Sequence, residues 1–564
     1  MPEQYLSHVI GASEPPLLDM TIGDALEEAA VKWPEELAVI SAPQNIRWRY
    51  AELEDRANRL AASFLALGMT TGDRIGIWAP NCVEWTLTQF AAAKLGLILV
   101  TINPAYRTSE LAYTLNKVGI KALVAAERFR TSNYVEMMES LAPEIVNSEP
   151  GRLASSAFPT LKCLIKIGGE KRTGWAPFES LQQCDDPALL AQVKTIGSQL
   201  KPDDAINIQF TSGTTGHPKG ATLSHRNILN NGYFVGGRLG LGRGDRLCLP
   251  VPLYHCFGMV MGNLGCITHG AAMVYPSAIF DPLAALQTIE TERCTGLFGV
   301  PTMFIAMLGH PDFAKYDLTS LRTGCMAGSP CPIEVMKRVI DEMNIKDITI
   351  AYGMTETSPV SFQSMRDDTT ERRVSTIGAV HPHLEVKIID ENGQTAPVGT
   401  PGEICTRGYS VMLGYWDDPE RTAEAIDGGG WMHTGDIGVI GADGYANVVG
   451  RLKDMVIRGG ENLYPREVEE FLHSHPQIAD VQVVGVPDEK YGEELCAWIQ
   501  LKSGASLRED DVRDYCEGRI TRHKVPRYIR FVQEFPTTVT GKVQKFEIRN
   551  AMIRELNLKE SKTA

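Results

Sequence analysis

The 564-residue chain lacks the cysteine patterns that mark metal sites or disulfide frameworks. Its 12 cysteines are scattered, with no CxxC pair and no Cys/His cluster along the sequence. This distribution indicates neither a zinc site nor a set of disulfides. Because free thiols are typical of a reducing compartment, we predict a cytoplasmic location.

Basic residues are also fewer than acidic residues. The chain has 55 Lys and Arg against 69 Asp and Glu, which gives a formal net charge of −14. An acidic protein repels phosphate backbones at long range, so we expect no nucleic-acid partner. A local basic pocket for a phosphorylated small molecule stays compatible with this balance.

Targeting signals and repeats are not visible in the sequence. The first residues, MPEQYLSHVIGASEPP, show no basic stretch followed by an apolar core, so they do not predict a secretory signal. The last residues, SKTA, are not a peroxisomal address. The composition, 43% hydrophobic and 22% charged, is that of a globular protein. A chain of this length is expected to form about two to four domains.

One stretch carries no charge at all. Residues 247–280 contain no Asp, Glu, Lys or Arg, and Gly258 and Gly262 form a GxxxG pair. Length alone would permit a membrane span. Prolines, histidines and Asn263 interrupt the run, however, so we expect a buried strand–helix–strand unit and no transmembrane segment.

Strand and helix patterns alternate in two successive series, over residues 74–126 and 246–353. In the first, the strand pattern RIGIWA precedes the helical pattern VEWTLTQFAAAKLG. Alternation of this kind predicts parallel sheets with helical crossovers. The pattern weakens between the two series, at residues 131–200, where we expect loops and surface helices.

The remainder of the chain follows different patterns. From 384 to 449 the helical pattern stops and short strands alternate with turn signals, which predicts antiparallel β structure. Beyond GRLKDMVIRGGENLYP lies a stretch of about 110 residues, the size of one small α+β domain. The predicted fold class is α/β: a large N-terminal region with two doubly wound parallel sheets and an antiparallel β subdomain, plus a small C-terminal α+β domain.

A loop rich in glycine and hydroxyl side chains follows the apolar run INIQF. In TSGTTGHPKG, residues 211–220, glycines let backbone N–H groups turn inward and Lys219 adds a cation, which favours an anion-binding nest. A Walker loop requires Gly-x-x-x-x-Gly-Lys-Ser/Thr. Here the fifth residue after Gly213 is Pro218, and Gly220 follows Lys219. The spacing excludes a P-loop kinase, while a flexible surface turn remains the alternative.

Two further segments suit a nucleotide. IAYGMTET, residues 350–357, ends a strand of the second series, and ligands bind at the carboxyl ends of parallel strands. Tyr352 suits stacking on a base, and Glu356 offers the oxygen ligand that Mg²⁺ requires. In WMHTGDIG, Asp436 suits two ribose hydroxyls. An ordinary polar turn is the alternative for each segment alone.

Five motifs in this order resemble one family. They are TSGTTGHPKG, YGMTE, TGD, GRLKDMVIRGGENLYPREVE and PTTVTGKVQK. Their order and spacing resemble the adenylate-forming superfamily of acyl-CoA synthetases, luciferases and peptide-synthetase adenylation domains over nearly the whole chain. Within it, the segments PLYHC, PTMF and GYWDDP look most like the subfamily of acyl-CoA synthetase family member 2 and its bacterial medium- and long-chain relatives.

The resemblance implies a two-step reaction that uses ATP, Mg²⁺ and coenzyme A. A carboxylate attacks the α-phosphate of ATP to give acyl-adenylate and pyrophosphate, and the thiol of coenzyme A then displaces AMP. By resemblance, Glu356 and Thr215 bind Mg²⁺ with Thr355 beside them, and Asp436 and Arg451 bind the ribose. The nucleotide-binding set that it implies is Thr211, Ser212, Gly213, Thr214, Thr215, Gly216, Lys219, Gly328, Ser329, Pro330, Ala351, Tyr352, Gly353, Asp436 and Arg451.

Lys542, in TVTGK, looks like the lysine that the small domain of this family inserts between the carboxylate and the α-phosphate. A solvated turn lysine is the alternative. The resemblance places a hinge at Lys453 and implies domains at 1–450 (acyl and ATP sites) and 455–564 (a mobile cap), joined by residues 451–454. After pyrophosphate leaves, the cap is expected to rotate and present Gly459 and Gly460, whose bare backbone lets pantetheine pass closely.

The acyl pocket that the resemblance implies is apolar. Acetyl-activating relatives carry a tryptophan where this chain has Gly353, so we expect an open tunnel there. Each buried methylene contributes about 0.8 kcal/mol, which favours medium- to long-chain fatty acids. His255 is expected to gate the tunnel or contact the carboxylate, unless it is a core histidine. The expected lining is Tyr254, His255, Phe257, Val300, Met326 and Gly353.

Several alternatives stay open. Branched and aryl acids are not excluded as substrates. Two other functions also fit: an adenylating enzyme that loads a carrier protein or oxidises its product, and a binding protein that has lost catalysis. The expected partners are the small molecules fatty acid, ATP and coenzyme A, and both a homodimer and a peripheral membrane contact are compatible with the sequence.

Overall fold

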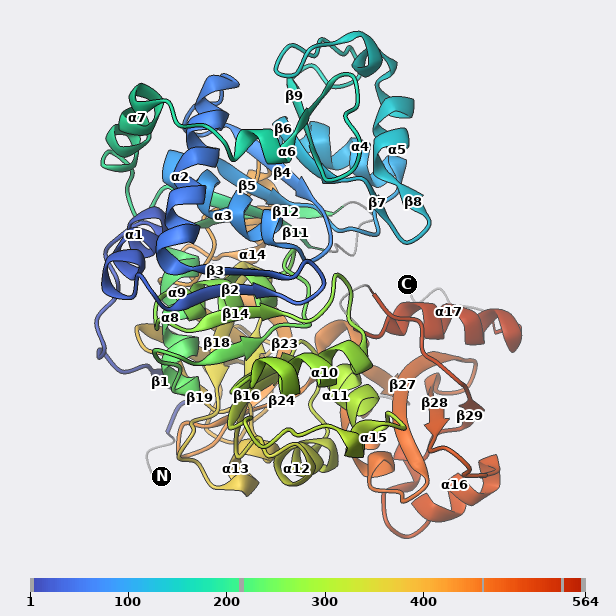
Figure 1. The fold of residues 1–564 in the computed structure, drawn as a ribbon. Coiled ribbons are helices and arrows are strands. Elements are labelled where there is room, and N and C mark those ends of the chain that lie inside the picture. Colours follow the sequence, from blue (N-terminus) through green and yellow to red (C-terminus); the bar gives the residue numbers. More distant parts are fainter. Residues whose placement is uncertain (1–4, 212–217, 459–460, 539–541, 559–564) are drawn as a thin grey trace.

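The computed structural model describes residues 5–211, 218–458, 461–538 and 542–558. Within these residues, sheets of eight, nine and five strands and a two-stranded ribbon at residues 128–133 form the N-terminal part of the chain, and a further five-stranded sheet forms the C-terminal part (Figure 1). The predicted α/β class, with its antiparallel subdomain and its C-terminal α+β unit, is confirmed.

The first sheet is parallel through its centre and antiparallel at one edge. Residues 131–200, where we expected only loops and surface helices, supply two of its parallel strands, β9 and β10. Across the sheet the strands are β10 (Trp175–Pro177), β9 (Cys163–Ile167), β6 (Ile120–Ala126), β4 (Arg74–Trp78), β5 (Ile98–Thr101), β11 (Ala205–Thr211), β12 (Lys219–Ser224) and β22 (Gly414–Tyr415).

The second sheet is parallel from β17 to β2 and antiparallel at both edges. Helices α10 (Pro282–Glu292), α11 (Pro301–Leu308) and α12 (Ile333–Glu342) cover its outer face (Figure 1). Its strands, in order, are β19 (Ala379–Val380), β18 (Val360–Gln363), β17 (Asp347–Gly353), β16 (Thr323–Ala327), β15 (Gly296–Gly299), β13 (Arg246–Cys248), β14 (Ala272–Tyr275), β2 (Leu37–Ser41) and β3 (Ile46–Arg49).

Helices α3 (Val83–Leu95) and α8 (His225–Leu239) join the two sheets. Every residue of α3 except Glu84 is buried, as expected for a helix that is apolar on all sides. It connects two strands of the first sheet, yet Thr86 bonds the hydroxyl of Tyr275 in the second sheet at 2.7 Å. Polar bonds from an otherwise apolar helix therefore fix one sheet relative to the other.

The uncharged stretch 247–280 lies inside this second sheet. It contributes part of β13, a π-helix at Phe257–Leu264 and β14, and all eight residues of the π-helix are buried. This arrangement confirms the buried strand–helix–strand unit. Among the described residues, none of the helices combines the length and apolarity that crossing a membrane requires.

The third sheet is wholly antiparallel and contains β1 (His8–Ile10), β20 (Leu384–Ile389), β21 (Gly402–Gly408), β23 (Met432–Ile440) and β24 (Ala446–Arg451). The expectation that helices stop from 384 to 449 is wrong at one point, because α14 (Pro419–Ala425) lies between β22 and β23. Asp418 caps α14 by accepting from the backbone N–H of Arg421 at 3.3 Å.

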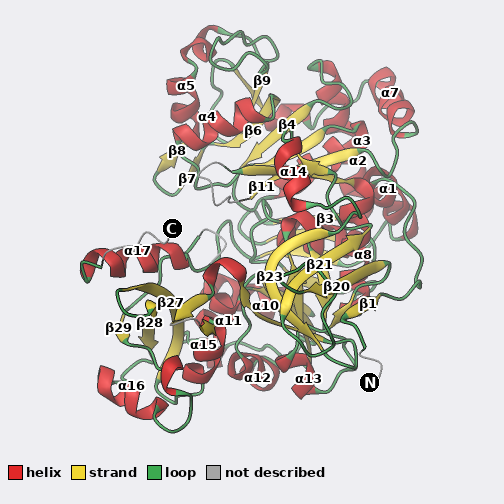
Figure 2. Cartoon of the chain, turned by 180° about the vertical axis from the view of Figure 1, so that it is seen from behind, coloured by secondary structure: helices red, strands yellow, loops and turns green. Residues whose placement is uncertain are grey.

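The C-terminal part is built on the long hairpin of β27 (Ile478–Asp488) and β28 (Gly492–Leu501). Helices α15 (Pro465–His473), α16 (Glu509–Cys516) and α17 (Lys545–Glu555) surround it (Figure 2). The remaining strands of its sheet are β25 (Val456–Arg458), β26 (Glu461–Leu463) and β29 (Tyr528–Phe531). Arg466 of α15 donates to the carbonyl of Val448 at 2.6 Å, which docks this part against β24.

Asn231 fixes the strand beside the carboxyl end of β17. Its buried side chain donates to the carbonyl of Val360 at 2.9 Å and accepts from the Val360 N–H at 3.0 Å. Truncation to alanine deprives two buried backbone groups of partners, at about 1–3 kcal/mol each. We therefore expect Asn231→Ala to lower the urea and thermal unfolding midpoints of the N-terminal part.

The matched control is Asn116→Ala, which removes a bond of 3.1 Å to the Ala157 carbonyl at an exposed position. Surface substitutions of this kind usually change stability by no more than about 0.5 kcal/mol. Equal shifts in the two variants would contradict the anchoring role of Asn231.

Candidate active site

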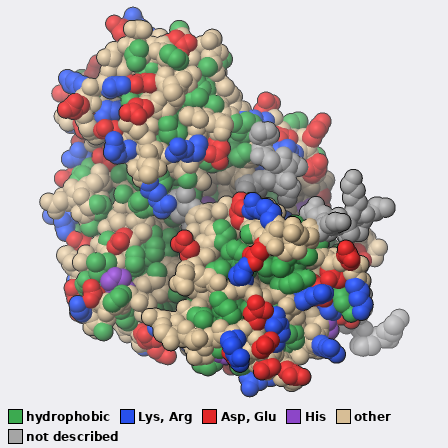
Figure 3. All heavy atoms as spheres, turned by 90° about the vertical axis from the view of Figure 1, so that its right-hand side faces the viewer, with side chains coloured by type: hydrophobic (Ala, Val, Ile, Leu, Met, Phe, Trp, Pro, Cys, Tyr) green, Lys and Arg blue, Asp and Glu red, His purple; other side chains and the backbone are tan. Residues whose placement is uncertain are grey.

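The predicted site residues come from strand ends of all three N-terminal sheets. Thr211 ends β11, Gly328 follows β16, and Tyr352 lies near the end of β17. Asp436 and Arg451 face each other across β23 and β24. The molecule is hollowed between the part built on the first sheet and the parts below it (Figure 3).

The predicted phosphate loop joins two antiparallel strands. Thr211, the last residue of β11, pairs with Lys219, the first residue of β12. A Walker loop instead runs from a strand into a helix, so this connection explains why the Walker spacing fails. The predicted phosphate ligands Ser212, Gly213, Thr214, Thr215 and Gly216 lie outside the described residues.

Glu356 is a buried carboxylate with two hydroxyl partners. It is 5% exposed, and its Oε1 accepts from the hydroxyls of Thr211 at 2.9 Å and Tyr415 at 3.0 Å. The ring of Tyr415 also lies 4.8 Å from the ammonium of Lys219. Thr211, Lys219, Glu356 and Tyr415 thus form one connected group, which we call the phosphate-side group.

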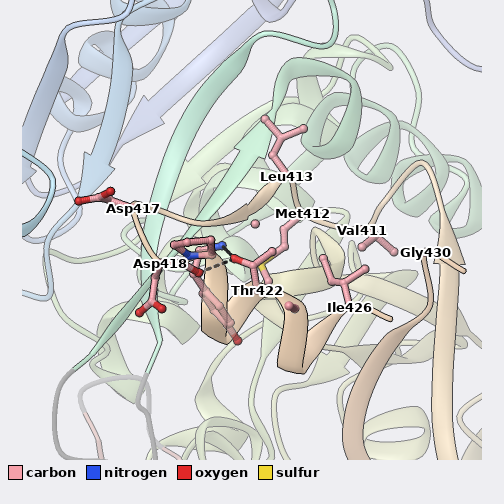
Figure 4. Close-up of a pocket in the computed structure, with 12 residues that line it drawn as sticks. Val411, Met412, Leu413, Asp417, Asp418, Thr422, Ile426 and Gly430 are labelled. Carbon is pink, nitrogen blue, oxygen red and sulfur yellow. Dashed lines mark hydrogen bonds between the residues drawn. The ribbon is translucent and has the colours of Figure 1, made fainter. Parts of the chain in front are cut away.

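Tyr415 also borders a hollow of about 710 Å³ between the chain at 411–419 and α14 (Figure 4). Its backbone N–H donates to the hydroxyl of Thr422 at 2.9 Å, which holds this segment against α14. On the other side, the N–H of Met412 donates to the carbonyl of Glu356 at 2.9 Å. The segment therefore sets the position of Glu356 through both its backbone and a side chain.

Asp436 connects the residues predicted for the base and the ribose. The hydroxyl of Tyr352 donates to its Oδ2 at 2.8 Å, and Nε of Arg451 donates to its Oδ1 at 3.0 Å. Burial, followed by the charge of Asp436, raises the pKa of Tyr352, so its hydroxyl stays a donor. A carboxylate has about four acceptor positions, so Asp436 can still accept from ribose hydroxyls.

Strand β16, which pairs with the strand of Tyr352, brings the predicted adenine-binding backbone to the same edge of the sheet. Ala327 at the end of β16 pairs in register with Ala351 of β17, so Gly328, Ser329 and Pro330 emerge beside Tyr352. Gly328 has a φ of +89°, a left-handed conformation that favours glycine. A Cβ there would lie 3.2 Å from Cγ1 of Val300, which links the adenine edge to the predicted acyl pocket.

Lys542 faces the same cleft from the C-terminal part. Its backbone is held to Thr538 by bonds in both directions, at 3.2 Å to the hydroxyl and 2.8 Å from the Thr538 N–H. The surrounding protein desolvates the ammonium and, with the charges of Arg451 and Lys453, lowers the pKa of Lys542 to about 8, against the opposing effect of Asp436. Lys542 therefore lies near the ribose-binding pair in this conformation.

His255 lies on the other side of Lys542. Desolvation, followed by the charge of Lys542, lowers the pKa of His255 to about 4, so the imidazole is neutral near pH 7. Its Nδ1 accepts from the backbone N–H of Phe257 at 3.2 Å. The proton of the neutral ring is then on Nε2, which is a donor suited to a carboxylate oxygen.

A cavity of about 40 Å³ lies next to His255, between the first sheet and the loops of the second. This volume exceeds what a single water molecule needs. Cys256 lies beside it and donates to the amide oxygen of Gln209 at 3.0 Å. The lining residues are Thr101, Asn103, Tyr106, Gln209, Phe210, Tyr254, His255 and Thr355.

The predicted acyl lining differs from the expected open tunnel. Phe257 packs against Phe298 with ring centroids 5.1 Å apart, and Met326 has no exposed surface. An ideal Cβ on Gly353 would lie 1.7 Å from the carbonyl oxygen of Pro359. The missing side chain therefore permits the close approach of the backbone before β18, and the space predicted along that direction is filled.

The predicted hinge lies within the described residues, whereas the predicted coenzyme A contacts do not. Lys453, the predicted hinge, is exposed in the short turn Leu452–Asp454 directly after β24. Gly459 and Gly460, the predicted coenzyme A contacts, lie outside the described residues.

Sequence reasoning missed two sets of residues in this site. Tyr415 belongs to GYWDDP, which the sequence analysis used only as a family signature. A tyrosine that ends a short strand can direct its hydroxyl toward a hydrogen-bond partner, and this was the missed signal. Gln209 and Asn207 are buried polar residues inside the apolar run INIQF, and they bond each other at 2.8 Å. Polar side chains at alternate positions of a buried strand were the signal for the cavity.

Two families match the chain. The family described as "AMP-binding enzyme" matches residues 26–416, and the family described as "AMP-binding enzyme C-terminal domain" matches residues 467–542. The "putative acyl-CoA synthetase YngI" of Bacillus subtilis is 48% identical over 97% of this chain and 99% of its own length. The "medium-chain acyl-CoA ligase ACSF2, mitochondrial" of Homo sapiens is 43% identical over 98% of this chain and 91% of its own length.

Solved structures agree with these matches. The anthranilate CoA ligase AuaEII, in complex with anthranoyl-AMP, has a TM-score of 0.84 at 27% identity and covers 97% of this chain and 100% of its own. A Mycobacterium tuberculosis fatty acyl CoA synthetase has a TM-score of 0.70 at 28% identity, over 95% and 99% of the two chains. The resemblance inferred from the five motifs is thereby confirmed, and the chain belongs to the AMP-binding enzymes, among their acyl-CoA synthetases.

Proposed function

We propose that this chain activates a medium- to long-chain fatty acid with ATP and transfers it to coenzyme A. The acyl-CoA synthetase reaction, through an acyl-adenylate and with release of pyrophosphate and then AMP, follows from the family. One observation carries its assignment to this cleft. Asp436 accepts from Tyr352 and Arg451, and four residues along from Tyr352, Glu356 accepts from Thr211 and Tyr415, which brings the predicted base, ribose and phosphate ligands together.

The position of each side chain in the site determines its proposed role. Lys542 stabilises the charge that develops between the carboxylate and the α-phosphate, where a preorganised cation is most effective. His255, neutral and protonated on Nε2, orients the attacking carboxylate. Tyr352 and Asp436, joined to Arg451, hold adenosine in place.

Mg²⁺ fits the phosphate-side group. Glu356 is buried, and both of its described side-chain bonds fall on Oε1, so Oε2 can serve as the hard oxygen ligand that Mg²⁺ prefers. Bound there, the ion would neutralise phosphate charge. Thr211 and Tyr415 keep the carboxylate oriented by donating to it, and Lys219 adds a fixed positive charge.

Fatty acid is favoured because aromatic side chains border the cavity beside His255. Tyr254, Phe210 and Tyr106 line it together with polar groups, and the relative from Homo sapiens is named a medium-chain ligase. The cavity of about 40 Å³ accommodates a carboxylate group, so an alkyl chain must displace neighbouring side chains as it extends.

An aryl acid is the second candidate, because the structure with a TM-score of 0.84 is an anthranilate CoA ligase. Cytoplasmic location also stays a prediction. All 12 cysteines are free, as in reducing compartments, while the relative from Homo sapiens is named mitochondrial. Homodimerisation and peripheral membrane contact stay predictions as well.

The substrate proposal predicts a clear dependence on chain length. Pyrophosphate release with coenzyme A present should show kcat/KM rising by roughly fourfold per added methylene until the pocket is filled. Benzoate and anthranilate serve as aryl comparisons, and omission of coenzyme A tests thioester formation. Faster turnover of the aryl acids, or no thioester with any fatty acid, would contradict the proposal.

The two half-reactions should depend on different residues. Lys542→Ala is expected to slow adenylate formation by on the order of 10²–10³-fold, because it removes the charge between the reacting groups. Thioester formation from supplied acyl-adenylate should persist. By the family resemblance, Gly460→Leu should do the reverse.

The control is Lys502→Ala, in the same part of the chain, where Nζ donates only to the exposed carbonyl of Pro476 at 2.7 Å. It should affect neither half-reaction. If Lys542→Ala reduces both half-reactions equally, Lys542 is not specific to the first.

The lowered pKa of Lys542 predicts an alkaline limb. With a pKa near 8 in the free enzyme, the cation is present below pH 8 and is lost as the pH rises above it. Since kcat/KM reports free-enzyme groups, kcat/KM for adenylate formation should fall above about pH 8. Lys542→Arg, whose pKa exceeds about 12, should remove this limb from whatever activity it retains. An unchanged limb in that variant would assign it to another group.

A further inference from the structure

Three side chains of metal-binding type converge on one face of the antiparallel sheet. Glu403 and Cys405 lie two residues apart on β21 and therefore share a face of the strand. His433 of β23 pairs directly with Cys405. Their ligand atoms all lie within 4.8 Å of one another. We call these three residues the Cys–His–Glu cluster.

The distances in the cluster are close to those of a tetrahedral zinc site. The Sγ of Cys405 lies 3.7 Å from Nδ1 of His433, which lies 3.0 Å from Oε2 of Glu403. Tetrahedral Zn²⁺ with bonds of about 2.3 Å to sulfur and about 2.0 Å to nitrogen and oxygen separates these atoms by about 3.6 and 3.3 Å. These two separations are within a few tenths of an ångström of those values, and the Cys405 and Glu403 ligand atoms, which lie within 4.8 Å of each other, must approach further for coordination.

The surrounding groups orient the ligands as they do in metal sites. The second oxygen of Glu403 accepts from the N–H of Gly435 at 3.0 Å. The other ring nitrogen of His433 faces a carboxylate oxygen of Asp427 at 3.7 Å. Asp427 is itself fixed by the N–H groups of Gly429 and Trp431, at 2.8 and 3.0 Å. A carboxylate behind a ligating histidine is typical of zinc centres.

Burial and charge also suit a divalent cation. Cys405 is fully buried, while the His433 side chain is 30% exposed, which leaves a solvent side for entry and for a water ligand. Thiolate and carboxylate ligands would neutralise a doubly charged ion. Lys387 and Arg407, both stacked on Trp431 at 4.3 and 4.5 Å, offset the nearby Asp427.

We propose that Glu403, Cys405 and His433 bind a divalent cation of the Zn²⁺ class, with water as the fourth ligand. Thiolate and imidazole favour this class over Mg²⁺ or Ca²⁺, which prefer oxygen. This metal-site proposal does not depend on which carboxylic acid the enzyme activates. The proposal differs from the expectation from the sequence, which indicated no zinc site, because sheet pairing joins residues 28 positions apart.

The test uses the full chain after removal of metal with a chelator. Co²⁺ serves as a spectroscopic probe, and we expect about one Co²⁺ per chain, a near-ultraviolet thiolate-to-cobalt charge-transfer band, and displacement by Zn²⁺. Cys405→Ser should abolish the band. Glu403→Gln, which keeps an acceptor for Gly435, should weaken Co²⁺ binding by roughly 10–100-fold.

The matched control is Cys496→Ser, a buried cysteine in β28 of the C-terminal sheet, which should leave the band unchanged. A Glu403–His433 ion pair that serves only to hold the turn predicts no stoichiometric Co²⁺ binding. That result, or a band that survives Cys405→Ser, would overturn the proposal. If Cys405→Ser does not fold, unchanged affinity in Glu403→Gln is equally decisive.

Discussion

The carboxylate of Asp436 is the interaction on which the arrangement of the site depends. It accepts from Tyr352 of the second sheet and from Arg451, and it lies on the antiparallel sheet itself. Residues 84 and 15 positions away along the chain are thus tied at one buried group that is 6% exposed. A buried carboxylate needs such partners to remain charged, and a charged carboxylate is what ribose hydroxyls require as an acceptor. Stability and nucleotide binding are therefore served by the same bonds.

Arg451 has a second role, because it is the last residue before the turn into the C-terminal part. Its charge lowers the pKa of Lys542, while Asp436 opposes that effect. In the conformation described here, the exposed Lys542 is therefore a cation close to a cation, in a part of the chain that α15 docks on β24. Triphosphate would relieve this repulsion by supplying negative charge.

The sequence predicts the parallel sheets and the strand-end position of the site well, because strand and helix periods are local signals. RIGIWA and VEWTLTQFAAAKLG became β4 and α3, and IAYG became the end of β17. What it does not predict is pairing between distant segments. The edge strands β9 and β10, the partner Tyr415 and the Cys–His–Glu cluster all depend on contacts that no local period encodes. The side-chain direction of Gly353 is filled by the backbone of Pro359, a contact that local sequence patterns do not encode.

The paired strands β11 and β12 fix the residues on either side of the predicted phosphate loop. A Walker loop relies on a helix N-terminus to supply positive potential. Here Thr211 and Lys219 stand opposite each other on paired strands, and Tyr415 connects Lys219 to Glu356, which in turn accepts from Thr211. Cation, carboxylate and hydroxyls are thus fixed on rigid strands before any ligand arrives. Preorganisation of this kind favours the state in which charge moves onto the departing pyrophosphate, because the surrounding groups need no reorganisation as that charge develops. The group on these strands, with Lys219 as its cation, is consequently suited to holding an anion.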